Sequence, residues 1–169
     1  MSDVSIICDF RSRCLEWRNV DDVVMGGVSH SALQSDSGKP AIFSGVLSLD
    51  RNGGFASVRT TLERHDFSAF DRFRIRVMGD GKRYSFRVRN DARFDGVVYA
   101  CDFGTVEGQW MEIDLPFSAF RPLFRGATVS GAPPMDPGKI VQIGFLIASK
   151  QEGPFCLELD WIGVTSAEC

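Results

Sequence analysis

The first residues whose types and spacing could do chemistry lie in the stretch NVDDVVMGGVSHS, residues 19–31. This stretch contains two carboxylates, a glycine pair and hydroxyl groups. Paired carboxylates such as Asp21 and Asp22 beside a glycine turn could hold Ca²⁺, which takes carboxylate and carbonyl oxygens. The spacing of a calcium-binding loop does not follow them, and local bonding of Asp to backbone N–H groups is common. The sequence therefore favours a turn shaped by these side chains over a metal site, without deciding between the two.

Two glycine pairs lie close to candidate binding residues. Gly26 and Gly27 follow the carboxylates, and Gly53 and Gly54 precede a strand pattern. Each pair can supply the positive φ of a hairpin turn. The alternative is that a glycine lets the backbone approach a ligand closely, and this also stays open.

Arginines are concentrated in one third of the chain. Residues 51–93 hold ten Arg and one Lys against five acidic residues, a balance of +6 in a chain of net charge −3. We expect Arg59 and Arg87 to lie close together on one sheet face near the DDVVMGG turn, joined by Arg74, Arg76 and Arg89 if their strands are neighbours. Such a face offers forked donors to carboxylate, phosphate or sugar hydroxyls, unless acidic residues of other strands neutralise it. The candidate ligand- or partner-binding residues are Asp21, Asp22, Gly26, Gly27, Ser29, Gly53, Gly54, Ser57, Arg59 and Arg87.

Several function classes find no support. The chain has no GxGxxG or GxxxxGK[ST] motif, and its two histidines, His30 and His65, lack metalloprotease spacing. We therefore predict no catalytic residue, no cofactor, no metal site and no enzyme activity. No nucleic-acid-binding motif accompanies the arginines, and no apolar run is long enough for a transmembrane segment. The odd number of cysteines, without CxxC spacing, predicts reduced thiols, no intramolecular disulfide and a cytoplasmic protein.

The elements that must position these residues are strands. Alternation of apolar and polar residues recurs in six segments: 71–80, 83–90, 96–103, 110–116, 140–148 and 154–164. This pattern predicts an all-β protein, an antiparallel two-sheet β-sandwich or jelly roll, as one domain over residues 1–169. The GDGK stretch at 79–82 is typical of a hairpin turn. The predicted core comprises Phe73, Ile75, Val77, Phe86, Val88, Ile143, Phe145, Leu157, Leu159 and Trp161.

These pieces together resemble the NADH:ubiquinone oxidoreductase complex I intermediate-associated protein 30 family. The matching segments are WRNVDDVVMGGVS (17–29), FSGVLSLDRNGGFASVR (43–59), FDRFRIRVMGDGKRYSFRVR (70–89), WMEIDLPFSAFRPLFRG (110–126) and IVQIGFLIASKQEGPFCLELDWI (140–162). The resemblance implies a galactose-binding-like jelly roll, and the family's mitochondrial members are assembly factors for the membrane arm of respiratory complex I. Some plant members carry an added dinucleotide-binding domain, which this chain lacks. The chain looks like a stand-alone, bacterial member.

Two functions follow as expectations. The first is a non-catalytic binding or assembly-factor-like protein with a chaperone role. Its partner would be a protein, such as a subunit or assembly intermediate of a respiratory complex, and its ligand a sugar or anionic group. The alternative is a carbohydrate-binding module of the jelly-roll type, since such folds often bind sugars on a concave face. Against it, the three tryptophans lie in apolar strand patterns that predict burial.

Overall fold

The computed structural model describes residues 3–12, 16–19, 30–36, 38–48, 54–93, 96–124, 127–148 and 151–167. Antiparallel strands dominate this part of the chain. The strands are β1 (Ser5–Asp9), β2 (Trp17–Asn19), β3 (His30–Gln34), β4 (Ala41–Leu47), β5 (Ala56–Thr60), β6 (Arg72–Met78), β7 (Arg83–Arg89), β8 (Val98–Gly104), β9 (Trp110–Pro116), β10 (Arg121–Phe124), β11 (Ala127–Thr128), β12 (Gln142–Ile147) and β13 (Gly153–Thr165). Two short 3₁₀ turns, η3 (Phe117–Ala119) and η4 (Pro137–Lys139), complete the regular structure.

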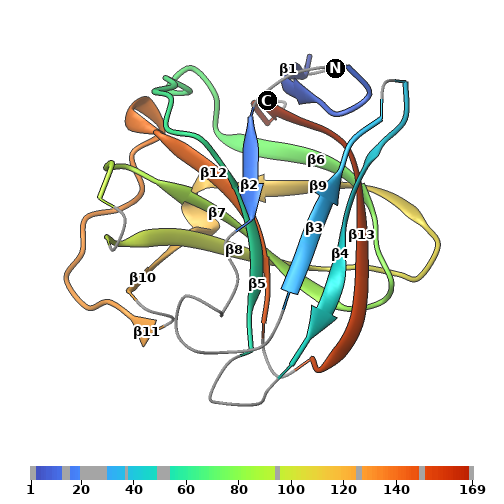
Figure 1. The fold of residues 1–169 in the computed structure, drawn as a ribbon. Coiled ribbons are helices and arrows are strands. Elements are labelled where there is room, and N and C mark those ends of the chain that lie inside the picture. Colours follow the sequence, from blue (N-terminus) through green and yellow to red (C-terminus); the bar gives the residue numbers. More distant parts are fainter. Residues whose placement is uncertain are drawn as a thin grey trace.

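Two sheets pack face to face (Figure 1). The first sheet has the order β3-β4-β13-β6-β9, with β1 also paired to β13, and the second has the order β11-β10-β8-β7-β12-β5-β2. Strand β1 pairs with the C-terminal part of β13, and Thr165 Oγ1 donates to the Asp3 carbonyl oxygen at 3.0 Å. The predicted all-β, antiparallel two-sheet sandwich is confirmed.

Aromatic side chains fill the space between the sheets. Phe73 of the first sheet packs on Phe86 of the second with ring centroids 4.9 Å apart, and Phe86 contacts Phe145 at 5.3 Å. Both sheets bury alternate residues because a half-buried strand turns every second side chain inward. All the predicted core residues except Trp161 are buried.

A β-bulge explains why Trp161 leaves the core. The pairing of β13 with β6 shifts between Leu159 and Trp161, so that the inward positions change from odd to even numbers. Leu159 and Ile162 are fully buried, whereas Trp161 is only half-buried. The other tryptophans, Trp17 and Trp110, are also half-buried, so the expected burial of all three is wrong in degree.

The GDGK stretch is not a hairpin turn, because β6 and β7 belong to different sheets. Their apolar faces meet across the core, and a hairpin would have placed both faces in one sheet. The crossing is held by Asp80, whose carboxylate accepts from Tyr84 Oη at 3.0 Å and from the Cys156 backbone N–H at 2.9 Å. Gly81, at φ +90°, supplies the left-handed backbone of the crossing.

One thiol prediction is also wrong. Cys8 is disulfide-bonded, although the odd cysteine count and the spacing predicted no bridge. Cysteine spacing cannot reveal which thiols the fold brings together, because a bridge requires two Cα atoms within about 7 Å in space. Cys101 and Cys156 have reduced thiols, the first buried and the second exposed.

Candidate functional site

The outer face of the second sheet carries a row of arginines and small polar residues. Val58, Phe86 and Phe145 are fully buried, so their chain neighbours point to the opposite face. We call this outward set the arginine face. It comprises Arg18 on β2, Ser57 and Arg59 on β5, Gln142 and Gly144 on β12, and Ser85, Arg87 and Arg89 on β7.

Gly144 stands between the two arginines predicted from the sequence. It pairs with Arg59 on one side and with Arg87 on the other, so the three residues are aligned in register across adjacent strands and lie on the same face of the sheet. A Cβ atom at Gly144 would lie 2.8 Å from the Val58 carbonyl oxygen and 3.2 Å from the Arg59 Cβ. The close approach of these backbones therefore requires glycine at this position. A cleft of about 50 Å³ lies beside it, lined by Arg59 and Arg87 among others.

The floor of this cleft is polar but recessed. Ser57, Ser85 and Gln142 are 6%, 5% and 5% exposed, respectively. Arg87 Nε donates to Ser85 Oγ at 3.2 Å, and Gln142 Nε2 donates to the Thr60 carbonyl oxygen at 2.8 Å. The first bond orients the Arg87 guanidinium group, and the second orients Gln142.

Positive charges repel one another on this face. The pKa of the Arg59 guanidinium is lowered to about 10, first by burial and then by neighbouring charges. Those charges belong, in order of effect, to Arg89, Arg18 and Arg87. Burial also lowers the pKa of Arg87, against the opposing influence of Asp102 and with a further lowering by Arg89. The arginine face thus concentrates positive charge where it is partly desolvated.

The remaining arginines of the expected cluster lie on the other sheet. Because β6 is in the first sheet, Arg74 and Arg76 point away from the arginine face. Asp114 accepts from Arg74 Nε at 2.6 Å and from Arg74 Nη2 at 3.2 Å. Asp160 accepts from Arg76 Nε at 3.0 Å. The alternative interpretation, arginines neutralised by acids of other strands, is therefore correct for this pair.

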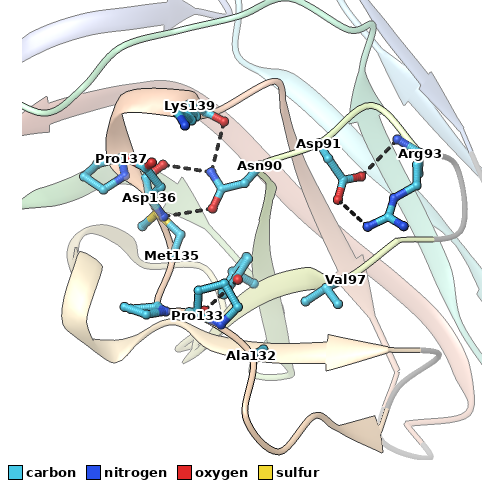
Figure 2. Close-up of a pocket in the computed structure, with 12 residues that line it drawn as sticks. Asn90, Asp91, Arg93, Val97, Ala132, Pro133, Met135, Asp136, Pro137 and Lys139 are labelled. Atoms are coloured by element: carbon cyan, nitrogen blue, oxygen red, sulfur yellow. Dashed lines mark hydrogen bonds and ion pairs between the residues drawn. The ribbon is translucent and has the colours of Figure 1, made fainter.

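A second cavity, with a volume of about 610 Å³, opens where β7 ends and the loop 132–139 passes (Figure 2). Asn90 clamps the loop, because its Nδ2 donates to the carbonyl oxygens of Asp136 at 2.8 Å and Lys139 at 3.0 Å. Its Oδ1 accepts from the Asp136 N–H at 2.8 Å. At the other side of the cavity in Figure 2, Arg93 Nη2 donates to Asp91 Oδ2 at 3.2 Å. These polar groups are occupied in shaping the loop.

Some of the predicted site residues lie together in the structure, and their binding role stays a prediction. Ser57, Arg59 and Arg87 share one sheet face, and Gly54 has a positive φ of 134° that suits the predicted turn. The sequence reasoning missed Gln142 and Gly144, although a glycine inside the apolar strand 140–148 is itself a sign of close backbone approach. Asn90 gave no signal, since its partners are distant in sequence. The other candidate residues lie outside the described part of the chain: Asp21, Asp22, Gly26, Gly27, Ser29 and Gly53.

Two further observations concern the described residues alone. None of their helices has the length and apolar character that a membrane crossing needs. Their His, Cys, Asp and Glu side chains form no group of three or more that could hold a metal ion.

The fold is that of a galactose-binding-like jelly roll. The family 11 carbohydrate-binding module of the cellulosomal cellulase Lic26A-Cel5E of Clostridium thermocellum superposes with a TM-score of 0.74 at 17% identity, over 99% of this chain and 98% of that one. A second structure, of the family 11 module from this organism in complex with a β-1,3-1,4-mixed-linked tetrasaccharide, superposes at 0.73 and 19% identity, over 98% of both chains.

Sequence comparison assigns the chain to a particular protein family. The chain belongs to the Complex I intermediate-associated protein 30 family, whose model matches residues 8–159. It is 29% identical to the mitochondrial Complex I intermediate-associated protein 30 of Mus musculus, over 97% of this chain and 57% of the mouse protein. The Drosophila melanogaster protein of the same name is 25% identical over 96% of this chain and 63% of its own length. The chain thus spans about six tenths of these relatives.

The relatives also correct the predicted location. Both named proteins are mitochondrial, which contradicts the cytoplasmic location expected from the cysteine pattern. That pattern is a poor guide here, because it also failed to predict the bridge at Cys8.

Proposed function

We propose that this chain is a non-catalytic, assembly-factor-like protein that binds a protein partner through the arginine face. One observation carries the proposal: Arg59 and Arg87, both partly exposed, flank Gly144 on one sheet face, with buried polar side chains beside them. Forked guanidinium donors around a small cleft recognise planar anionic or hydroxyl-rich groups. The arrangement positions and holds a group, and we assign it no bond-making step.

The names of the relatives support the choice of partner. Both are called intermediate-associated proteins of complex I, so we propose a respiratory-complex subunit or assembly intermediate as the partner. A chaperone role fits this proposal, since a positively charged face can cover an acidic surface of a subunit before assembly. The part of the relatives that this chain does not span could carry other contacts.

A carbohydrate-binding module is the second candidate, because a structural neighbour binds a mixed-linked tetrasaccharide. Sugar-binding faces usually stack sugar rings on exposed aromatic side chains. In the described part of the arginine face, the aromatic residues of β7 and β12 point inward: Tyr84, Phe86 and Phe145 are all buried. The face therefore fits an anionic group better than a stacked sugar ring.

Affinity capture with matched variants tests the proposal. Arg59→Ala with Arg87→Ala removes two positive charges from the face, whereas Lys39→Ala with Arg64→Ala removes two from exposed positions elsewhere. We expect quantitative mass spectrometry of captured proteins from the native host to show one set lost with the first variant and kept with the second. Equal capture by both variants, with both folded by circular dichroism, would contradict the proposal.

A further inference from the structure

The cavity of about 610 Å³ beside the loop 132–139 is held in shape by the chain itself. Asn90 makes three hydrogen bonds to the loop, at Asp136 and Lys139. Tyr99 Oη donates to the Pro133 carbonyl oxygen at 2.7 Å, which ties the loop to strand β8 as well. The cavity is therefore preorganised, and a group that enters it does not have to order the loop, which would otherwise weaken binding.

The wall of the cavity is mostly apolar. Val97, Pro133 and Pro134 line it at partly or fully exposed positions, together with Met135 and Tyr99, which are buried. Proline rings and aromatic rings pack well on one another, as in the recognition of proline-rich segments by aromatic-lined grooves. A cavity walled by prolines thus suits the flat face of an aromatic group.

The polar groups of the wall are largely engaged within the chain (Figure 2). Asp91 accepts from the Arg93 backbone N–H at 3.0 Å and from Arg93 Nη2 at 3.2 Å. Asp136 Oδ1 accepts from the Gly138 N–H at 2.9 Å. The charged residues among the described lining residues are two acids and two bases, which balance: Asp91, Asp136, Arg93 and Lys139. An uncharged group that gains from apolar contact therefore fits this cavity better than an ion.

The cavity adjoins the arginine face. Arg89 and Val98 line the cleft on that face, and the residues next to them in sequence, Asn90 and Val97, line the cavity. Arg89 Nη1 also donates to the carbonyl oxygen of Arg93, a residue of the cavity wall, at 2.8 Å. A partner seated on the arginine face is thus close enough to insert a side chain into the cavity. Protein interfaces commonly combine a polar surface with a pocket that takes an aromatic anchor.

Resting on the proposed function, we propose that the protein partner inserts an uncharged aromatic side chain into this cavity, against Pro133 and Pro134. The volume lies within the roughly 300–1,000 Å³ of cavities that take small molecules, so it accepts a large ring together with the backbone that carries it. Aromatic side chains bury about 150–250 Å² each and dominate the energetics of many interfaces. The cavity supplies affinity, and the charged face beside it supplies orientation and speed of association.

Nuclear magnetic resonance titration of the full ¹⁵N-labelled chain with N-acetyl-tryptophanamide tests the site. This probe is uncharged and aromatic, and N-acetyl-alaninamide is its control. We expect saturable shifts of the backbone amides of Val97, Tyr99 and Met135 with the first compound and none with the second. Salt up to about 0.2 M should not raise the Kd, because screening acts on charges.

Two matched variants locate the bound probe. Ala132→Phe adds a ring at the cavity wall, whereas Ala119→Phe adds the same ring at an exposed position on η3. We expect the Kd of the probe to rise about fivefold or more in the first variant and to stay within about twofold in the second. Pro134→Ser removes one proline ring from the wall and replaces Ala132→Phe if that variant does not fold. Its Kd should rise roughly threefold or more.

Several results would overturn the aromatic assignment. An absence of saturable shifts, equal binding of N-acetyl-alaninamide, or an unchanged Kd in the cavity variants would each do so. Free indole that binds at least about tenfold more tightly than N-acetyl-tryptophanamide would assign the cavity to a free small molecule. Stronger binding of a mixed-linked glucan tetrasaccharide at the same amides would assign it to a sugar.

Affinity capture from the native host separates this inference from the proposed function. We expect Ala132→Phe, shown to be folded by circular dichroism, to lose the partner that Ala119→Phe retains. If Ala132→Phe keeps the partner while Arg59→Ala with Arg87→Ala loses it, the aromatic anchor is wrong and the proposed function stands. If the arginine variant keeps the partner, the proposed function itself is wrong.

Discussion

Strands β6 and β7 present the same alternation of arginine and apolar residues and meet opposite surroundings. On β6, each of the arginines Arg72, Arg74 and Arg76 hydrogen-bonds to a carboxylate, at Asp71, Asp114 or Asp160. On β7, Arg87 faces a glycine and an alanine. Burial lowers its pKa, Asp102 opposes this lowering, and Arg89 adds to it. Period-two alternation decides which side chains point outward, and the residues on neighbouring strands decide what those side chains do.

We propose that the difference separates a structural face from a binding face. Arginines that find carboxylates on neighbouring strands hold those strands in register. Arginines whose pKa is lowered by burial and like charge, as at Arg59, are the kind that cluster at functional sites. The predictions below test this separation, from the largest expected effect to the smallest.

Asp160→Ala should cause the largest loss of stability. Asp160 is 7% exposed and accepts from Arg11 Nε at 2.6 Å and from Arg76 Nε at 3.0 Å. Removing it takes the closest carboxylate from both guanidinium groups and leaves Arg76 only the longer ion pair with Glu112 at 3.8 Å, at a cost of about 2–3 kcal/mol in the free energy of unfolding. Urea denaturation measures this cost, with Arg11→Ala as the milder control because its side chain is 45% exposed. A loss no larger than that of the control would show that the first face does not depend on its internal acid.

Asp114→Asn should cost less, and its cost should depend on pH. Hydrogen bonds from Arg74 and Arg72 hold the pKa of Asp114 below its usual value. A carboxyl group with a lowered folded-state pKa stabilises the protein above its unfolded pKa of about 3.9, and the contribution disappears as pH falls through the folded value. We expect a difference of about 0.5–1 kcal/mol at neutral pH, because the pair is partly exposed.

Measuring this stability difference at several pH values provides an internal control. The stability difference between wild type and Asp114→Asn should stay constant from pH 7 to about pH 5 and shrink below about pH 4. A difference that persisted unchanged at pH 2 would mean that the ionised carboxylate is not what stabilises this face.

The sequence predicts which side chains face the core better than it predicts which strands pair with one another. Alternation places Phe73 and Phe86 inward and the arginines outward without any structural information. It cannot tell that β6 and β7 lie in different sheets, because the Gly-Asp chemistry of 79–82 suits a crossing as well as a hairpin. Nor can it place the bulge at Asp160, where one extra residue on β13 changes which face Trp161 occupies.

The site follows the same division. Ser57, Arg59 and Arg87 were predictable because their facing depends only on local alternation. The role of Gly144 depends on the two neighbouring strands that the fold brings beside it. The hydrogen bonds of Asn90 depend on a loop nearly fifty residues away in sequence, at Asp136. Such long-range relations leave no periodic trace in a single sequence.

The most direct test of the account is the free energy of unfolding of Arg74→Gln and Arg87→Gln, measured side by side by urea denaturation at low salt. Each substitution removes one outward-pointing guanidinium group from the middle of a strand. We expect Arg74→Gln to lose about 0.5–1 kcal/mol with its two bonds to Asp114, and Arg87→Gln to lose nothing or to gain up to about 0.5 kcal/mol as repulsion on the arginine face falls. Equal losses in the two variants would contradict the account, because Arg87 would then be as structural as Arg74.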